Sequence, residues 1–327
     1  MQLPEAVTPV AAGIYQVQIP LPFALRIVNC YLLEDAGRWT VVDTGLHRPD
    51  AEAIWRTAFD ALHIEPGDIT QIVLTHMHPD HYGMAGWFQA LTGAPVRMSA
   101  REAESALVTW VYADPRYALI DAQMHKGGVP QDIINLVNEG IESTRQMTFP
   151  HPKHIEHMAY GSTVRMGGRD FKAIHAPGHS DGLIMFYDEA DKLILSGDHV
   201  LMKITPNIGL WVDTEPQPLG RFMGSLRALQ HLDVKLALPG HKALITDWGG
   251  RIGELLHHHD ERLAKTLDAV KGGAVAFDVA RALFNFERLS AHEMRFALVE
   301  TLAHLEYLVG IGAVQQTDGA AWRFEQG

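Results

Sequence analysis

The sequence predicts a mixed α/β domain followed by a smaller, mainly helical unit. Short apolar runs bracketed by turn residues, such as 29–33 and 39–43, indicate strands. Helical patterns separate the later strands, and this alternation is typical of α/β proteins. After Trp248, Gly249 and Gly250 the pattern becomes helical, so the smaller unit is expected to begin at residue 251.

The first 250 residues are expected to form one larger domain with a helical insert. Strands are expected at 14–19, 29–33 and 39–43, followed by a helix at 49–62, a strand at 71–75 and a helix at 82–91. Further along the chain, strands are expected within 163–196, then a helix at 218–229 and a strand at 236–238. The stretch from about 99 to 160 is helical and irregular. It is expected to form a lid that contains Trp110, Tyr112, Met124 and Met147.

Residues 251–327 predict a winged-helix-like domain. Helices are expected at about 251–271, 275–285 and 290–308, and Asp318-Gly319 between two short alternating runs is a strong hairpin signal. A winged helix suggests nucleic-acid binding, so the charge of this unit matters.

The charge of residues 251–327 does not favour nucleic acid. Eight Lys and Arg stand against eleven Asp and Glu, and the third helix carries Glu293, Glu300 and Glu306 against Arg295 alone. Because acidic surfaces repel phosphate, we expect this unit to pack on the larger domain, line its cleft or form a homodimer.

Composition narrows the class of protein further. The chain has 327 residues and a net charge of −12, and no apolar run approaches the roughly 20 residues that a membrane span needs. The N-terminal residues lack the pattern of a secretory signal, and Cys30 is the single cysteine. We therefore expect a cytoplasmic protein with no disulfide, and a buried, inert Cys30.

A dense histidine motif indicates a metal site. His76, His78, Asp80 and His81 lie within six residues, directly after a predicted buried strand. His76 and His78 are two apart, so both imidazoles can point to one side, while Asp80 and His81 begin the next helix. Three further segments place a possible ligand directly after glycine at the end of an apolar strand: His179, Asp198 and His241.

These four segments, in order, resemble the metallo-β-lactamase-fold hydrolase superfamily over roughly residues 10–245. The resemblance implies an αββα sandwich with metals at one edge between the sheets. It also implies that one metal takes His76, His78 and His179, the other takes Asp80, His81 and His241, and Asp198 bridges the two. Asp80 and Asp198 are the expected catalytic residues, and Asp43 is implied to orient ligands by hydrogen bonding.

The ligand chemistry and the resemblance together predict a binuclear hydrolase. Nitrogen and carboxylate ligands suit two zinc ions, with manganese or iron as alternatives. A hydroxide bridging two such ions needs no side-chain nucleophile. We expect a small-molecule ester or thioester as substrate, as in glyoxalase-II-like enzymes and lactonases. The 251–327 unit is similar to the extension of the β-lactamase-like protein 2 type, whose members include an endoribonuclease.

The sequence departs from the motifs of some branches of this superfamily, and three other functions compete with the hydrolase prediction. Asp198 argues against a true β-lactamase, and His78 against flavodiiron oxidoreductases. The rivals are a phosphodiesterase or endoribonuclease, a mononuclear iron persulfide dioxygenase that uses only His76, His78 and His179, and a non-enzymatic binding role.

Several other residues carry weaker expectations. Tyr82 and His199 are candidates for substrate contact or leaving-group protonation. Two groups of histidines are expected on the surface: His151, His154 and His157, and His257, His258 and His259.

Overall fold

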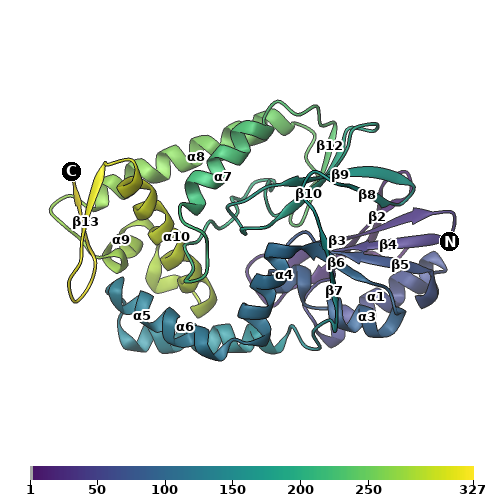
Figure 1. Ribbon diagram of the computed structural model, residues 1–327, viewed down its shortest axis with the longest axis horizontal. Helices are drawn as coiled ribbons and strands as arrows, with labels where there is room; N and C mark the ends of the chain where they lie inside the picture. Colours follow the sequence, from purple (N-terminus) through teal and green to yellow (C-terminus); the bar gives the residue numbers. More distant parts are fainter. Residues whose placement is uncertain (1–2) are drawn as a thin grey trace.

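The computed structural model of the protein, described here for residues 3–327, contains two facing β-sheets and a terminal hairpin (Figure 1). The first sheet has seven strands in sequence order: β1 (Val7–Ala11), β2 (Ile14–Pro20), β3 (Ile27–Asp35), β4 (Arg38–Val42), β5 (Ile69–Val73), β6 (Val96–Ser99) and β7 (Ile155–Met158). The second sheet has five strands, which in spatial order are β12 (Leu236–Pro239), β11 (Leu193–Gly197), β10 (Ile184–Asp188), β9 (Arg169–His175) and β8 (Thr163–Met166).

Helices cover the outer face of each sheet. On the first sheet, α1 (Pro49–Leu62) and α3 (Ala85–Thr92) bury Trp55 and Phe88, whose rings meet edge to face at 4.9 Å. On the second sheet, α7 (Pro218–Leu229) and α8 (Trp248–Ala269) bury an equivalent apolar layer. The expected αββα order is confirmed.

The core between the sheets brings the ends of parallel strands to one edge. Val42, Val73, Phe186 and Leu238 are buried in this layer. Strand β4 pairs with β5 in parallel, and β11 pairs with β12 in parallel. The residues that follow these four strands therefore emerge on the same side of each sheet.

The expected insert and the C-terminal elements form a helical lobe beside the sandwich (Figure 1). The insert contains α4 (Ala100–Ala106), a π-helical turn (Leu107–Val111), α5 (Asp114–Lys126) and α6 (Gln131–Gln146), after which β7 returns to the first sheet. The C-terminal part contains α9 (Ala276–Leu283), α10 (Ala291–Gly310) and the hairpin of β13 (Val314–Thr317) and β14 (Arg323–Gln326).

The two parts of this lobe share one apolar core, in which α6 packs against α10. Its buried members are Ile120, Met124, Val129, Ile134, Val137, Ile141, Ala280, Phe286, Ala297, Leu298 and Val299. The winged-helix description and the division of the chain at residue 250 stay predictions, and α8 itself runs across that division.

The helices differ from the expected ones at one position. The helix expected at 82–91 is divided into α2 (Pro79–Tyr82) and α3, with Gly83 and Met84 between them. Within residues 3–327, no helix combines the length and apolar character that crossing a membrane requires.

Candidate metal centre

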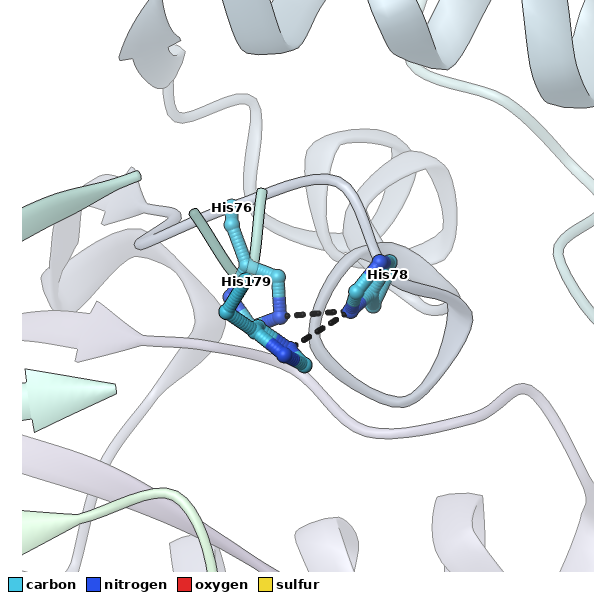
Figure 2. A group of neighbouring side chains, drawn as sticks. All are labelled: His76, His78 and His179. Atoms are coloured by element: carbon cyan, nitrogen blue, oxygen red, sulfur yellow. Dashed lines mark hydrogen bonds between the residues drawn. The ribbon is translucent and has the colours of Figure 1, made fainter. Parts of the chain in front are cut away.

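Three histidines from two loops converge at the edge of the sandwich (Figure 2). His76 and His78 follow β5, and His179 follows β9. The Nδ1 atom of His78 lies 3.1 Å from His76 Nε2 and 2.9 Å from His179 Nε2. A single proton on His78 satisfies only one of these two contacts, whereas one cation accepts a lone pair from all three nitrogens.

Hydrogen bonds at the opposite ring nitrogens orient two of these histidines. His179 Nδ1 donates to the backbone oxygen of Asn207 at 2.9 Å. His76 Nδ1 lies 2.9 Å from Thr75 Oγ1, whose own proton goes to Asp43. In both rings Nε2 is therefore left as an acceptor that faces the centre, the usual arrangement for histidine ligands.

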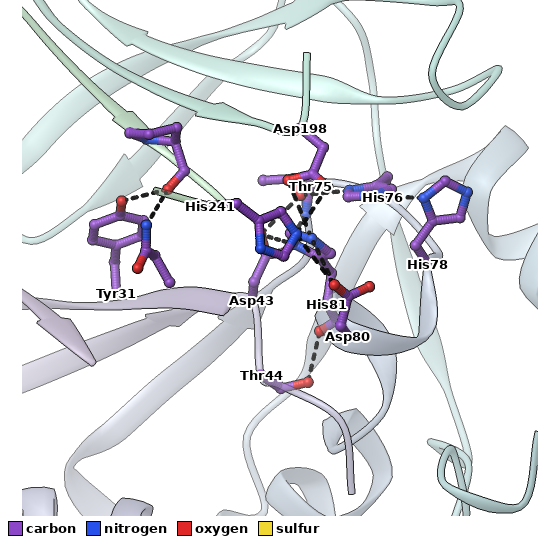
Figure 3. A network of polar contacts seen from close by, with 12 residues as sticks. Tyr31, Asp43, Thr44, Thr75, His76, His78, Asp80, His81, Asp198 and His241 are labelled. Carbon is purple, nitrogen blue, oxygen red and sulfur yellow. Dashed lines mark hydrogen bonds and ion pairs between the residues drawn. The ribbon is translucent and has the colours of Figure 1, made fainter. Parts of the chain in front are cut away.

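A second cluster lies beside the first and contains Asp80, His81 and His241 (Figure 3). Helix α2 places Asp80 and His81 on one turn, and His241 follows β12. His241 Nε2 lies 3.2 Å from Asp80 Oδ2, while its Nδ1 donates to the backbone oxygen of Ile27 at 2.7 Å. His81 Nδ1 donates to Asp43 Oδ2 at 2.8 Å, which turns its Nε2 towards the cluster.

Asp198 lies between the two clusters. Its Oδ1 is 3.3 Å from His81 Nε2, and its Oδ2 is 3.2 Å from His241 Nε2 and 3.7 Å from His179 Nε2. The carboxylate therefore faces histidines of both groups.

Buried polar atoms without partners show that the residues fit divalent metal ions. Among residues 3–327, His81 Nε2, His241 Nε2 and Asp198 Oδ1 are buried and have no hydrogen-bond partner. Buried polar atoms are normally paired, so these atoms, which lie in the candidate ligand groups, need a further partner. Imidazole nitrogen and carboxylate oxygen suit a divalent cation.

The charges of the second cluster also call for a cation. Although burial opposes protonation of His241, the carboxylates of Asp198 and Asp80 raise its pKa to about 10. Burial likewise opposes protonation of His81, yet Asp198, Asp43 and Asp80 raise its pKa. The carboxylates therefore concentrate negative charge around these two rings, which favours a cation at this position.

Glycines directly before two candidate ligands let the backbone pass close to neighbouring side chains. Gly178, before His179, has a φ of +129°, and a Cβ there would lie 2.4 Å from Phe222 Cβ. A Cβ on Gly240, before His241, would lie 2.2 Å from Asp198 Oδ1. A side chain at either position would displace a candidate ligand or its support.

The sequence interpretation missed Glu102, which joins two ligand loops. Its fully buried carboxylate accepts hydrogen bonds from Met77 N at 2.7 Å, Ser180 Oγ at 2.5 Å and Gly182 N at 2.6 Å. Glu102 therefore ties the loop of His76 and His78 to the loop of His179. No local pattern around Glu102 indicates this role.

Asn29 and Tyr31 were also missed, and they hold the His241 turn against the other sheet. Asn29 Nδ2 donates to the backbone oxygens of Pro239 and Lys242 at 3.0 Å, and the Tyr31 hydroxyl donates to Pro239 at 2.7 Å (Figure 3). Both residues come from β3, so their partners are more than 200 residues away.

A cavity of about 250 Å³ opens beside the two clusters. His78, Asp80, His179 and Asp198 line one part of it. The remaining wall combines apolar side chains of the insert, of the 201–214 segment and of α10: Trp110, Ile141, Leu201, Ile204, Trp211 and Phe296.

Most of the weaker candidates lie elsewhere. Tyr82 is buried in the core of the first sheet with its hydroxyl 3.4 Å from His151, and His199 is buried beside Ser225. Neither lines the cavity, so the suggested substrate contacts are wrong for this pocket.

The lid residues and the histidine run need a similar correction. Of Trp110, Tyr112, Met124 and Met147, only Trp110 lines the cavity. Met124 is in the core of the lobe, and Tyr112 faces solvent. His154, His157 and His257 are exposed as expected, but His259 is buried 3.4 Å from His304, because successive helical residues point about 100° apart. Cys30 is buried, as predicted.

The fold and the donor set define a metal-dependent hydrolase, and comparison with known proteins supplies the family. Residues 24–241 match the metallo-beta-lactamase superfamily, and residues 263–327 match its metallo-beta-lactamase-like C-terminal domain. The chain belongs to this superfamily.

Similar proteins agree with that class. The chain is 26% identical over 307 residues to the probable metallo-hydrolase YqjP of Bacillus subtilis, covering 89% of this chain and 91% of YqjP. It is 24% identical to an atrochrysone carboxyl ACP thioesterase of Cryptosporiopsis sp., over 78% of this chain and 62% of that protein. A metallo-beta-lactamase family protein from Thermus thermophilus superposes with a TM-score of 0.88 at 33% identity, over 97% of this chain and 99% of that one.

Proposed function

We propose that this metal-dependent hydrolase is binuclear and cleaves an ester or thioester. The observation that carries the proposal is the position of Asp198, whose two oxygens face histidines of two separate donor clusters. In this assignment His76, His78 and His179 hold one ion, Asp80, His81 and His241 hold the other, and Asp198 contacts both. Zinc suits the donors, and manganese or iron can replace it.

The metal ions supply one part of the chemistry and the chain supplies the rest. Two bound divalent ions polarise a carbonyl and lower the pKa of water from 15.7 towards ~7. Asp43, Thr75 and Asn207 fix the rings of His81, His76 and His179 through hydrogen bonds. Asp80 and Asp198 line both the metal centre and the cavity, and are the proposed catalytic carboxylates.

The cavity and the relatives support a small carbonyl substrate. The apolar side chains of Trp110, Trp211 and Phe296 line the cavity together with the metal-centre residues and can pack against an apolar part of the substrate. One relative is named as an ACP thioesterase, which is a precedent for thioester cleavage. Nucleic acid is not favoured, because the net charge of −12 gives no general attraction for phosphate. The cytoplasmic location and a homodimer stay predictions.

Two measurements test the proposal. Elemental analysis of the purified protein is expected to give two metal equivalents, and a panel of thioesters, lactones, phosphodiesters and RNA is expected to show cleavage of a thioester or lactone. One tightly held iron together with persulfide-dependent oxygen uptake would instead indicate the dioxygenase. Cleavage of RNA alone would assign the site to a ribonuclease.

A matched pair of variants makes the test specific. His241→Gln removes one proposed ligand and should lose about one metal equivalent and most of the activity. His257→Gln, the same change on an exposed face of α8, should alter neither quantity. If both variants keep full metal content and activity, the second cluster does not bind metal.

A further inference from the structure

Arg295 is a buried cation in the cavity wall without an anionic partner. It lies on α10 and is 6% exposed. Among residues 3–327 no carboxylate pairs with it, the charge that acts on it is the like charge of Arg116, and its Nε atom is buried without a hydrogen-bond partner. Its single hydrogen bond is a long contact of 3.4 Å from Nη2 to His292 Nδ1.

The cavity carboxylates outside the metal centre are engaged by other groups. Asp213 accepts from Arg116 at 2.9 Å, and Asp181 accepts from Arg101 at 2.7 Å and Arg221 at 2.8 Å. The Glu293 carboxylate accepts from the backbone N and the hydroxyl of Ser290 at 2.9 and 2.7 Å. Arg295 is therefore the charged side chain of this wall whose charge no neighbour neutralises.

The surroundings of Arg295 make its unpaired charge energetically unfavourable. The guanidinium lies 5.5 Å from the ring centre of Trp211 and 4.8 Å from that of Phe296. Burial, together with the like charge of Arg116, lowers the pKa of Arg295 to about 10. A buried charge is normally paired, so an unpaired one that faces a cavity indicates a ligand of opposite charge.

We propose that Arg295 binds a carboxylate of the substrate, remote from the bond that is cleaved. The cavity then holds both ends of one molecule: the scissile carbonyl at the metal centre and the carboxylate at Arg295, with an apolar part between them against Trp211 and Phe296. This inference rests on the proposed function for its substrate class, and it names that substrate as an acid with an ester or thioester at the other end.

A carboxylate fits this position better than a phosphate group. The planar guanidinium can offer two parallel N–H donors to the two oxygens of a carboxylate. A phosphate monoester carries a second negative charge, for which this apolar wall offers no second free cation, because Arg116 is paired with Asp213.

Binding can be measured independently of hydrolysis. The probes are 4-phenylbutyrate and its neutral amide, 4-phenylbutanamide, titrated by calorimetry into the metal-loaded protein. Wild type should bind the acid more tightly than the amide, and Arg295→Met should weaken binding of the acid by about 10-fold to 100-fold, as expected for hydrogen bonds to a charged group. Any binding of the acid to metal is common to both proteins and does not contribute to this difference.

Three controls keep the result specific. Arg295→Lys keeps the charge but loses the planar pair of donors, so it should retain part of the affinity. Arg281→Met makes the same change at an exposed arginine of α9, which pairs with Glu287 outside the cavity, and should leave binding unchanged. Circular dichroism verifies that each variant is folded.

Kinetics then connect the site to the substrate. The ratio of kcat/KM for an S-glutaryl thioester to that for the S-pentanoyl thioester of the same thiol should fall about tenfold or more in Arg295→Met. Equal affinity of wild type for acid and amide, or unchanged binding of the acid in Arg295→Met, would overturn the proposal. A greater loss of affinity for inorganic phosphate than for the carboxylate in Arg295→Met would also overturn it. If neither a thioester nor an ester is cleaved, the proposed function fails while calorimetry still decides the carboxylate site.

Discussion

His81 Nδ1 lies 2.8 Å from Asp43 Oδ2, and neither side chain is more than 2% exposed. The same carboxylate accepts the backbone N–H and the hydroxyl of Thr75, both at 2.8 Å. Since the Thr75 hydroxyl oxygen in turn contacts His76, Asp43 orients one histidine of each cluster. Asp43 is thus a positioning residue for both donor clusters, without being in any of the candidate ligand groups.

Replacing Asp43 should weaken metal binding without removing a ligand. In Asp43→Asn one oxygen becomes an NH₂ group that cannot accept the proton of His81 Nδ1. Loss of such an orienting partner typically costs 10-fold to 100-fold in metal affinity, about 1.4–2.7 kcal/mol. Competition with a chelator measures this change. Asp170→Asn, at an exposed carboxylate, is the control, and equal affinity in the two variants would rule out the orienting role.

Replacing Asp198 should affect both metal positions. Asp198→Ala removes a negative charge from a centre that must balance two divalent cations, so we expect loss of at least one metal equivalent and most of kcat. Asp198→Asn keeps the shape but loses the charge, and should be nearly as damaging. The fold should survive in both variants, because strands organise the core. Full metal content in Asp198→Ala, measured beside circular dichroism and turnover, would make the bridging assignment wrong.

The buried pair of His259 and His304 should make stability sensitive to acid. Burial lowers the pKa of His259 to about 3 and of His304 to about 4, from an ordinary value of 6.5. The unfolded chain therefore takes up protons between pH 6.5 and 4 that the folded chain does not, so stability is complete above pH 6.5 and is lost as the pH falls.

The loss of stability on acidification has an upper limit for each histidine. From pH 6.5 to 5 each of these histidines removes up to ~2 kcal/mol from the free energy of unfolding. Glu300, whose pKa burial raises to about 7, acts in the opposite direction, as does His241 in the metal-free chain. The buried His199 and His292, whose pKa values burial lowers to about 3, act in the same direction as the pair. Urea unfolding at pH 7 and pH 5 measures the difference. A free energy of unfolding that rises at pH 5 would contradict the prediction.

Arg295→Met should stabilise the protein even as it impairs binding. A buried charge without a partner disfavours folding, and an apolar side chain of similar length can pack between Trp211 and Phe296 instead. We expect the free energy of unfolding in urea to increase by about 1 kcal/mol or more. A purely structural arginine would give the opposite sign, so a clear destabilisation would indicate that Arg295 serves the fold.

The sequence predicts most of the metal centre because its signals are local. Each candidate ligand sits in a short segment, and glycines such as Gly178 and Gly240 mark the turns that admit it. Glu102 carries no such signal, since its three partners lie 25 to 80 residues away in the chain. Its role becomes visible only when the two loops that it joins are placed side by side.

Arg295 shows a different limit. In the sequence it is a single basic residue on a helix with three glutamates, and the charge balance argues against nucleic acid without indicating which of these side chains is buried. In the structure Glu300 is half-buried and bonded to Asn207, and Arg295 faces the cavity, because α10 packs against α6. Which face of a helix is buried depends on its neighbours, and these come from a distant part of the chain.

The apolar core shared by α6 and α10 has a consequence for how such enzymes can diversify. Grafting the insert alone, or the C-terminal part alone, onto a relative would leave half of this interface exposed to water. The two segments therefore have to be exchanged together, although the strands of the second sheet lie between them in the chain. Since residues of both line the substrate cavity, a recombination event that moves both segments would carry a new specificity with it and leave the metal ligands in place.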